Sequence, residues 1–107
     1  DADLVFDVRC FPNPFYIDEL KYKTGNDKEV QDYVMSFSES QIFMDKLCDM
    51  IKFLIPLYEE EGKVSITIAI GCTGGKPRSV TMTNKLGDYV KTLGYNTNVT
   101  YRDIGRE

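Results

Sequence analysis

The chain has 107 residues, with 13 lysines and arginines against 17 aspartates and glutamates, and a formal net charge of −4. It contains no histidine, which excludes a Ser-His-Asp triad, a Cys-His pair and a histidine-ligated zinc site within these residues. A hydrophobic fraction of 42% is sufficient for a compact core. The negative net charge argues against nucleic-acid binding through bulk electrostatics, although a local basic patch remains compatible with it.

The three cysteines are an odd and sparse set, typical of a reduced cytoplasmic protein rather than a secreted disulfide scaffold. The amino terminus lacks the basic and apolar regions of a signal peptide, and no stretch is apolar enough to span a membrane. The chain has no initiator methionine and enters an apolar segment within three residues. We therefore expect residues 1–107 to be one domain of a longer protein.

Residues 4–8 form the first predicted strand, because Leu-Val-Phe-Asp-Val is short and rich in strand-forming residues. Two prolines in the following segment, residues 9–15, predict an extended loop. Asp27 is then predicted to cap a short helix that runs to about Phe37.

A longer helix is predicted to begin at Ser38 or Ser40, since apolar residues recur there every three or four positions and form one face. We expect Pro56 to kink or shorten its last turns and Gly62 to end it.

The second half of the chain predicts a strand over 64–70, a helix over 77–93 followed by Gly94, and a last strand over 97–101. The strand over 64–70 places Ser, Thr and Ala on one side and β-branched residues on the other, which suits helices packed on both faces. The alternating order predicts a single-domain α/β sandwich with a mostly parallel sheet and helices on both faces.

The loop Gly71–Ser79, which joins the predicted central strand to the next helix, is the strongest candidate site. Its glycines allow successive backbone N–H groups to point at one anion, and a helix amino terminus adds partial positive charge. Thr73, Lys76, Arg78 and Ser79 add donors and charges. We expect a phosphate or other small anion to bind here; the alternative is a tight turn whose glycines only let the helix pack. The chain has no G-x-x-x-x-G-K-[ST] motif, so P-loop nucleotide hydrolysis is not encoded in it.

The same loop permits a second interpretation, a cysteine-dependent phosphatase. Cys72 and Arg78 have the C-x5-R spacing in which a thiolate attacks phosphate and an arginine grips it, and Asp7 would be the general acid. However, Gly71 stands where a histidine usually precedes the cysteine.

Asp7 and Arg9 lie two residues apart, so on a strand their side chains point the same way. They either position each other and bind a ligand, or form only a structural ion pair. For Tyr16, Tyr22 and Tyr33, half-buried packing is favoured over stacking on a sugar or base.

Several separated motifs resemble one family, the carboxy-terminal domain of RapZ/YvcJ-type proteins, over nearly the whole chain. The motifs are Leu4–Arg9, Pro12–Pro14, Thr24–Val30, Ile68–Lys76, Arg78–Val80 and Arg102–Asp103. The chain departs from the family where Pro77 and Tyr101 replace usual histidines.

The resemblance implies a cytoplasmic two-domain parent protein whose amino-terminal P-loop domain, absent from this chain, binds ATP or GTP. It implies that the present domain is similar to a phosphofructokinase subdomain, forms homo-oligomers, senses glucosamine 6-phosphate and contacts a small regulatory RNA as part of an RNase adapter. The ligand-site positions that carry over are Asp7, Arg9, Asn13, Cys72, Thr73, Gly74, Gly75 and Arg78, with Lys76 and Ser79 beside them. RNA contacts would come from Arg9, Lys76, Arg78 and Arg102.

We therefore predict a ligand-sensing domain rather than an enzyme, with a phosphorylated small molecule or inorganic anion as partner. No metal and no cofactor is expected in this domain, and no membrane contact. The alternative is the cysteine-dependent phosphatase.

Overall fold

The computed structural model describes residues 2–72, 77–94 and 96–103, with the backbone alone at Cys72, Pro77, Arg102 and Asp103. The elements in chain order are β1 (Leu4–Asp7), the 3-10 helix η1 (Pro14–Tyr16), α1 (Lys28–Met35), α2 (Ser38–Glu60), β2 (Ile66–Cys72), α3 (Pro77–Lys91) and β3 (Thr97–Asp103). The predicted strands and helices are confirmed to within about two residues at their ends. Among the described residues, no helix is long and apolar enough to cross a membrane.

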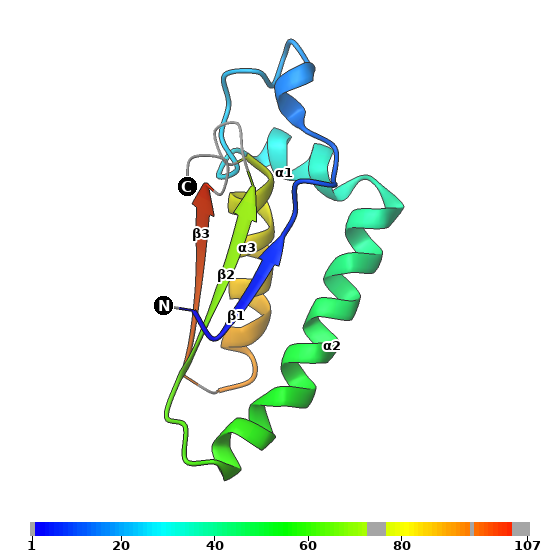
Figure 1. The fold of residues 1–107 in the computed structure, drawn as a ribbon. Coiled ribbons are helices and arrows are strands. Elements are labelled where there is room, and N and C mark those ends of the chain that lie inside the picture. Colours follow the sequence, from blue (N-terminus) through cyan, green and yellow to red (C-terminus); the bar gives the residue numbers. More distant parts are fainter. Residues whose placement is uncertain (1, 73–76, 95, 104–107) are drawn as a thin grey trace.

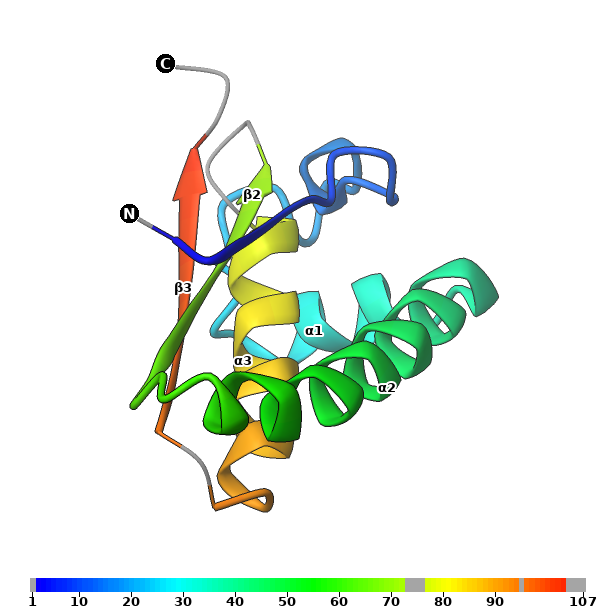
Figure 2. The same ribbon diagram turned by 60° about the horizontal axis from the view of Figure 1, so that its bottom comes forward.

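The three strands form one parallel sheet in the order β1-β2-β3. Both connections therefore move in the same direction across the sheet, and right-handed crossovers then place their helices on the same side. Figures 1 and 2 show the described helices together on one face of the sheet, with the other face open. The single-domain α/β fold with a parallel sheet is confirmed, but it differs from the expected sandwich because the described helices do not cover both faces.

The core lies between the sheet and the helices. Ile66, Ile68 and Ile70 of β2 are fully buried on the covered face. They pack with apolar residues of the three helices, chiefly Val30, Val34, Leu47, Ile51, Ile55, Met82, Leu86 and Val90. On the open face, Val5 is 55% exposed and is in register with Ala69, which in turn pairs with Thr100. Burial alternates along β1 and over residues 97–100 of β3, as a sheet with one covered face requires, whereas the small Ala69 of the central strand is fully buried although its side chain is on the open face.

Individual residues explain where the helices α1 and α2 begin and end. Gly62 has φ +84° and ends α2, with its N–H donating to Glu59 C=O and the next N–H donating to Tyr58 C=O. These two hydrogen bonds are those of a Schellman motif. Asp27 occupies the predicted N-cap position of α1, but its carboxylate accepts from the Thr24 N–H at 2.8 Å rather than from the helix. The helix α2 continues through Pro56 to Glu60, so Pro56 does not end it.

Candidate functional site

The candidate site lies where the carboxyl ends of β1 and β2 meet the amino end of α3. Asp7, the last residue of β1, is in register with Gly71, and the Val8 N–H donates to the Gly71 C=O at 2.8 Å. The chain then turns, with the Phe11 N–H donating to the Val8 C=O. Open parallel sheets bind ligands outside the carboxyl ends of their strands, so the position is suited to a ligand.

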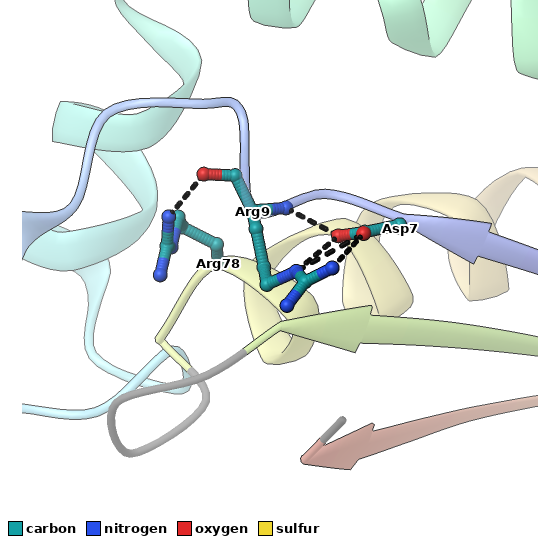
Figure 3. A network of polar contacts seen from close by, with 3 residues as sticks. All are labelled: Asp7, Arg9 and Arg78. Carbon is teal, nitrogen blue, oxygen red and sulfur yellow. Dashed lines mark hydrogen bonds and ion pairs between the residues drawn. The ribbon is translucent and has the colours of Figure 1, made fainter. Parts of the chain in front are cut away.

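Asp7 and Arg9 form an ion pair at this edge (Figure 3). Arg9 Nη2 lies 2.8 Å from Asp7 Oδ2 and Nε 3.0 Å from the same oxygen, while the Arg9 backbone N–H donates to Oδ1 at 2.9 Å. Hydrogen bonds from the guanidinium and from this N–H lower the pKa of the Asp7 carboxyl, and the Arg78 charge adds to the shift. Both side chains are about half exposed, 50% for Arg9 and 48% for Asp7, so the pair presents opposite charges to solvent.

Arg78 lies in the first turn of α3 and is only 5% exposed. Its Nη1 donates to the carbonyl oxygen of Arg9 at 2.6 Å (Figure 3). The same nitrogen donates to the carbonyl oxygen of Phe11 at 3.2 Å. A buried guanidinium requires such acceptors, because burying an uncompensated charge is costly. Arg78 therefore ties the loop after β1 to α3 and fixes the backbone that carries Arg9.

Two further predicted ligand residues, Asn13 and Ser79, are a helix cap and a buried residue, respectively. The Asn13 side-chain oxygen accepts from the Phe15 N–H at 3.0 Å and caps η1, with Pro14 at its first position. Ser79 is fully buried in the first turn of α3.

For the other predicted site residues, the structure describes either the backbone alone or nothing. The strand register puts Cys72 beside Asp103 and Gly71 beside Arg102, at the same edge as Asp7. Thr73, Gly74, Gly75 and Lys76 lie outside the described residues. The structure thus brings together Asp7, Arg9 and Arg78 with their side chains.

The contacts at this edge disfavour the phosphatase interpretation. A general acid must carry a proton, whereas the lowered pKa keeps Asp7 ionised at neutral pH. In addition, one end of the Arg78 guanidinium holds backbone carbonyls rather than facing an open phosphate site. Within the described parts of the chain, no group of three or more acidic or cysteine side chains is arranged to hold a metal ion.

A cluster that we name the aromatic platform, Phe15, Tyr16, Lys21 and Tyr22, lies on the segment that projects beyond the carboxyl ends of the strands in Figure 1. Tyr16 is 81% and Tyr22 88% exposed, so the expectation that these two rings pack half-buried was wrong. Lys21 Nζ lies 5.3 Å from the centroid of the Phe15 ring and 5.7 Å from that of Tyr22.

Sequence reasoning missed this platform because it weighed each tyrosine separately. The sequence does contain a signal for it: residues 15–22 include four aromatic or basic residues and show neither helical nor strand periodicity. Tyr33, by contrast, packs against Phe37 as expected, with ring centroids 5.2 Å apart.

Known proteins resemble this chain over its whole length. A family model, the RapZ C-terminal domain, matches residues 1–105. The chain is 60% identical over its full length to a nucleotide-binding protein of Caldanaerobacter subterraneus subsp. tengcongensis and 59% identical to one of Thermoanaerobacter sp. (strain X514), covering 38% of each. It is 55% identical over its full length to a nucleotide-binding protein of Clostridium novyi, of which it covers 36%. The chain thus spans little more than a third of the length of these relatives, and it belongs to the RapZ C-terminal domain family.

Proposed function

We propose that this domain binds a small phosphorylated metabolite at the carboxyl edge of its sheet, with glucosamine 6-phosphate as the first candidate. The observation that carries the proposal is the half-exposed Asp7–Arg9 pair, held beside the amino end of α3 by the buried Arg78. The nucleotide binding that the names of the relatives state would then belong to a part of the parent protein outside this chain.

An amino-sugar phosphate matches the charges of this pair. Its phosphate would be met by the Arg9 guanidinium and the partial positive charge at the start of α3. Its ammonium group, or a sugar hydroxyl, would be met by the Asp7 carboxylate, which in its ionised form is negatively charged and only accepts hydrogen bonds. The lowered pKa of Asp7 keeps it in that form.

Isothermal titration calorimetry with glucosamine 6-phosphate tests the proposal. Arg9→Ala should weaken binding by about 1.5–3 kcal/mol, or roughly 10- to 150-fold, the usual value of a hydrogen bond to a charged group. Lys91→Ala is the matched control, because it removes an exposed cation from the opposite end of α3. No binding by the wild-type chain, or equal losses in both variants, would overturn the proposal.

A second set of titrations separates the two charges of the ligand. With glucose 6-phosphate, which lacks the amine, binding should be weaker than with glucosamine 6-phosphate. Asp7→Asn should abolish this preference while phosphate recognition by Arg9 remains. A preference that survives Asp7→Asn would show that Asp7 does not contact the amine.

RNA binding is a second candidate function, favoured by the aromatic platform. Exposed rings beside a lysine can stack on unpaired bases while the cation meets the backbone. Arg78 is a poor contributor because it is buried, whereas the Arg9 side chain is half exposed. The side chains of Lys76 and Arg102 lie outside the described structure.

Fluorescence anisotropy with a labelled single-stranded RNA tests this second function. Tyr22→Ala should cost about 1–3 kcal/mol of binding free energy, and affinity should fall steeply with salt. Tyr58→Ala is unsuitable as a control because Tyr58 packs on the core, so the exposed Phe53→Ala on α2 serves instead. Absence of binding at low salt would rule the function out for this chain.

A further inference from the structure

Strand β3 is an outer edge of the described sheet, because it pairs with β2 on one side and with no described strand on the other. Figures 1 and 2 show no described element beyond it on that side. The Ile66 N–H donates to the Asn96 C=O at 3.1 Å. Because backbone groups alternate in direction along a strand, those of Asn98 and Thr100 also face β2, whereas those of Val99 face outward.

This edge lacks the features with which proteins usually protect a free strand. Charged residues, prolines, bulges and short length are the common protections, because they prevent other chains from pairing with the edge. From Thr97 to Tyr101, β3 has no proline and no charged residue, and its pairing with β2 runs without a bulge. The strand at the opposite edge, β1, is only four residues long. The edge at β3 is therefore the better suited to accept an added strand.

A groove of about 550 Å³ runs along this edge, between β3 and one side of α3. We name it the edge groove; the residues of its lining used below are Thr83, Gly87, Asp88, Lys91 and 97–100. The Thr83 hydroxyl donates to the Thr100 C=O at 3.5 Å, and Lys91 lies two turns further along α3. Gly87 lies between them, and a Cβ there would meet nothing within 4 Å. A glycine in mid-helix costs about 1 kcal/mol relative to alanine, and here it leaves space for an incoming side chain.

Two opposite charges line the same groove. Asp88 and Lys91 are exposed, and neither forms an ion pair within the described residues. Along the helix axis, Gly87 lies about 6 Å from Lys91. Side chains on one side of a strand are about 7 Å apart. A strand added beside β3 would therefore place one side chain over Gly87 and the next one on that side near Lys91.

These positions specify the chemistry of the added strand. A lysine or arginine over Gly87 would lay its alkyl stem in the free space and carry its charge to the Asp88 carboxylate. An aspartate or glutamate two positions away would meet the Lys91 ammonium group. Antiparallel pairing is the commoner and slightly more stable kind, and in that direction the basic residue precedes the acidic one.

We propose that the edge groove binds an extended segment of another protein, which adds to β3 as an antiparallel fourth strand. The segment carries a basic residue over Gly87 and an acidic residue two positions later. Main-chain hydrogen bonds supply affinity in this mode of recognition, and the side-chain positions supply specificity. This chain contains no lysine or arginine followed two positions later by aspartate or glutamate, so a second copy does not supply the segment. The proposal is independent of the phosphorylated-ligand site, which lies at the carboxyl ends of β1 and β2.

Fluorescence anisotropy with two labelled synthetic peptides tests the proposal. The matching peptide is Thr-Val-Thr-Lys-Thr-Glu-Thr-Val, blocked at both ends, and the control peptide has the same composition with Lys and Glu exchanged. The matching peptide should bind at least about fivefold more tightly, because the exchange replaces two attractive pairs by two repulsive ones. No binding of the matching peptide, equal binding of the two, or tighter binding of the control peptide would each overturn the proposal.

Variants of the chain locate the binding. Gly87→Leu should weaken binding of the matching peptide at least about tenfold by filling the groove, without loss of helix. Lys91→Glu should weaken it about fivefold, whereas Lys85→Glu, the same change at an exposed position of α3 outside the groove, should leave it unchanged. Circular dichroism of each variant verifies that the fold is retained. Binding that survives Gly87→Leu, or that falls equally in Lys91→Glu and Lys85→Glu, would show that the peptide does not occupy the groove.

Discussion

Replacing Arg78 with alanine tests whether this residue holds the site together. The substitution removes a buried guanidinium that donates to two backbone carbonyls, at 2.6 Å and 3.2 Å. A hydrogen bond to a charged group contributes about 1.5–3 kcal/mol, and the longer of the two contributes less. We expect Arg78→Ala to lower the free energy of unfolding by about 3 kcal/mol. This loss is large against the typical 5–15 kcal/mol of a folded domain, but most molecules remain folded.

Urea denaturation followed by circular dichroism measures the effect, with thermal denaturation as a check. For a chain of this size, about 3 kcal/mol corresponds to a fall in Tm of about 12 °C or more. Arg78→Lys should be intermediate, because an ammonium group keeps the charge but not the planar fork that reaches both carbonyls. Lys85→Ala, at an exposed position of the same helix, should change stability by less than about 0.5 kcal/mol. A loss below about 1 kcal/mol for Arg78→Ala would refute the role assigned to these hydrogen bonds.

Three other changes follow from the structure. Hydrogen bonds from Lys63 and from the Thr67 N–H lower the pKa of Asp3, so its stabilising effect is complete at neutral pH and is lost as the pH falls below about 4. Asp3→Asn should therefore flatten the acid side of a plot of urea midpoint against pH, and an unchanged plot would contradict this. Gly62→Ala should destabilise the chain by about 1 kcal/mol, because φ is +84° there. Gly87→Ala should instead stabilise it by up to about 1 kcal/mol, since a Cβ in mid-helix would meet nothing within 4 Å; chemical denaturation of both variants checks the two opposite signs.

The strands and helices could be predicted because local chemistry determines them. The β-branched run of β2, the apolar periodicity of α2 and the glycine after it each specify an element without reference to the rest of the chain. The face of the sheet on which the helices pack was harder to predict from the sequence. Small residues along β2 indicated a second covered face, but the covering of a sheet depends on strand order, which the residues of one strand do not encode.

For the candidate site, the sequence predicts a place in the fold but not the contacts that the side chains make there. The glycine-containing loop between a strand and a helix led to the prediction of a site at the edge where the structure places Asp7, Arg9 and Arg78. The partners of Arg78 could not be predicted, because they are backbone carbonyls nearly 70 positions away and carry no sequence signal. The capping role of Asn13 was available in principle, since an asparagine before a proline is a common helix start.

The most direct test of phosphorylated-ligand binding at this edge is an NMR titration of the isotopically labelled chain with glucosamine 6-phosphate. Binding at the proposed site predicts saturable shifts that are largest at the backbone amides of Val8, Arg9, Ser79 and Val80. It also predicts that Arg9→Ala abolishes them at the same ligand concentrations. No saturable shifts, or shifts confined to the far end of α3 around Lys91, would contradict the proposed site.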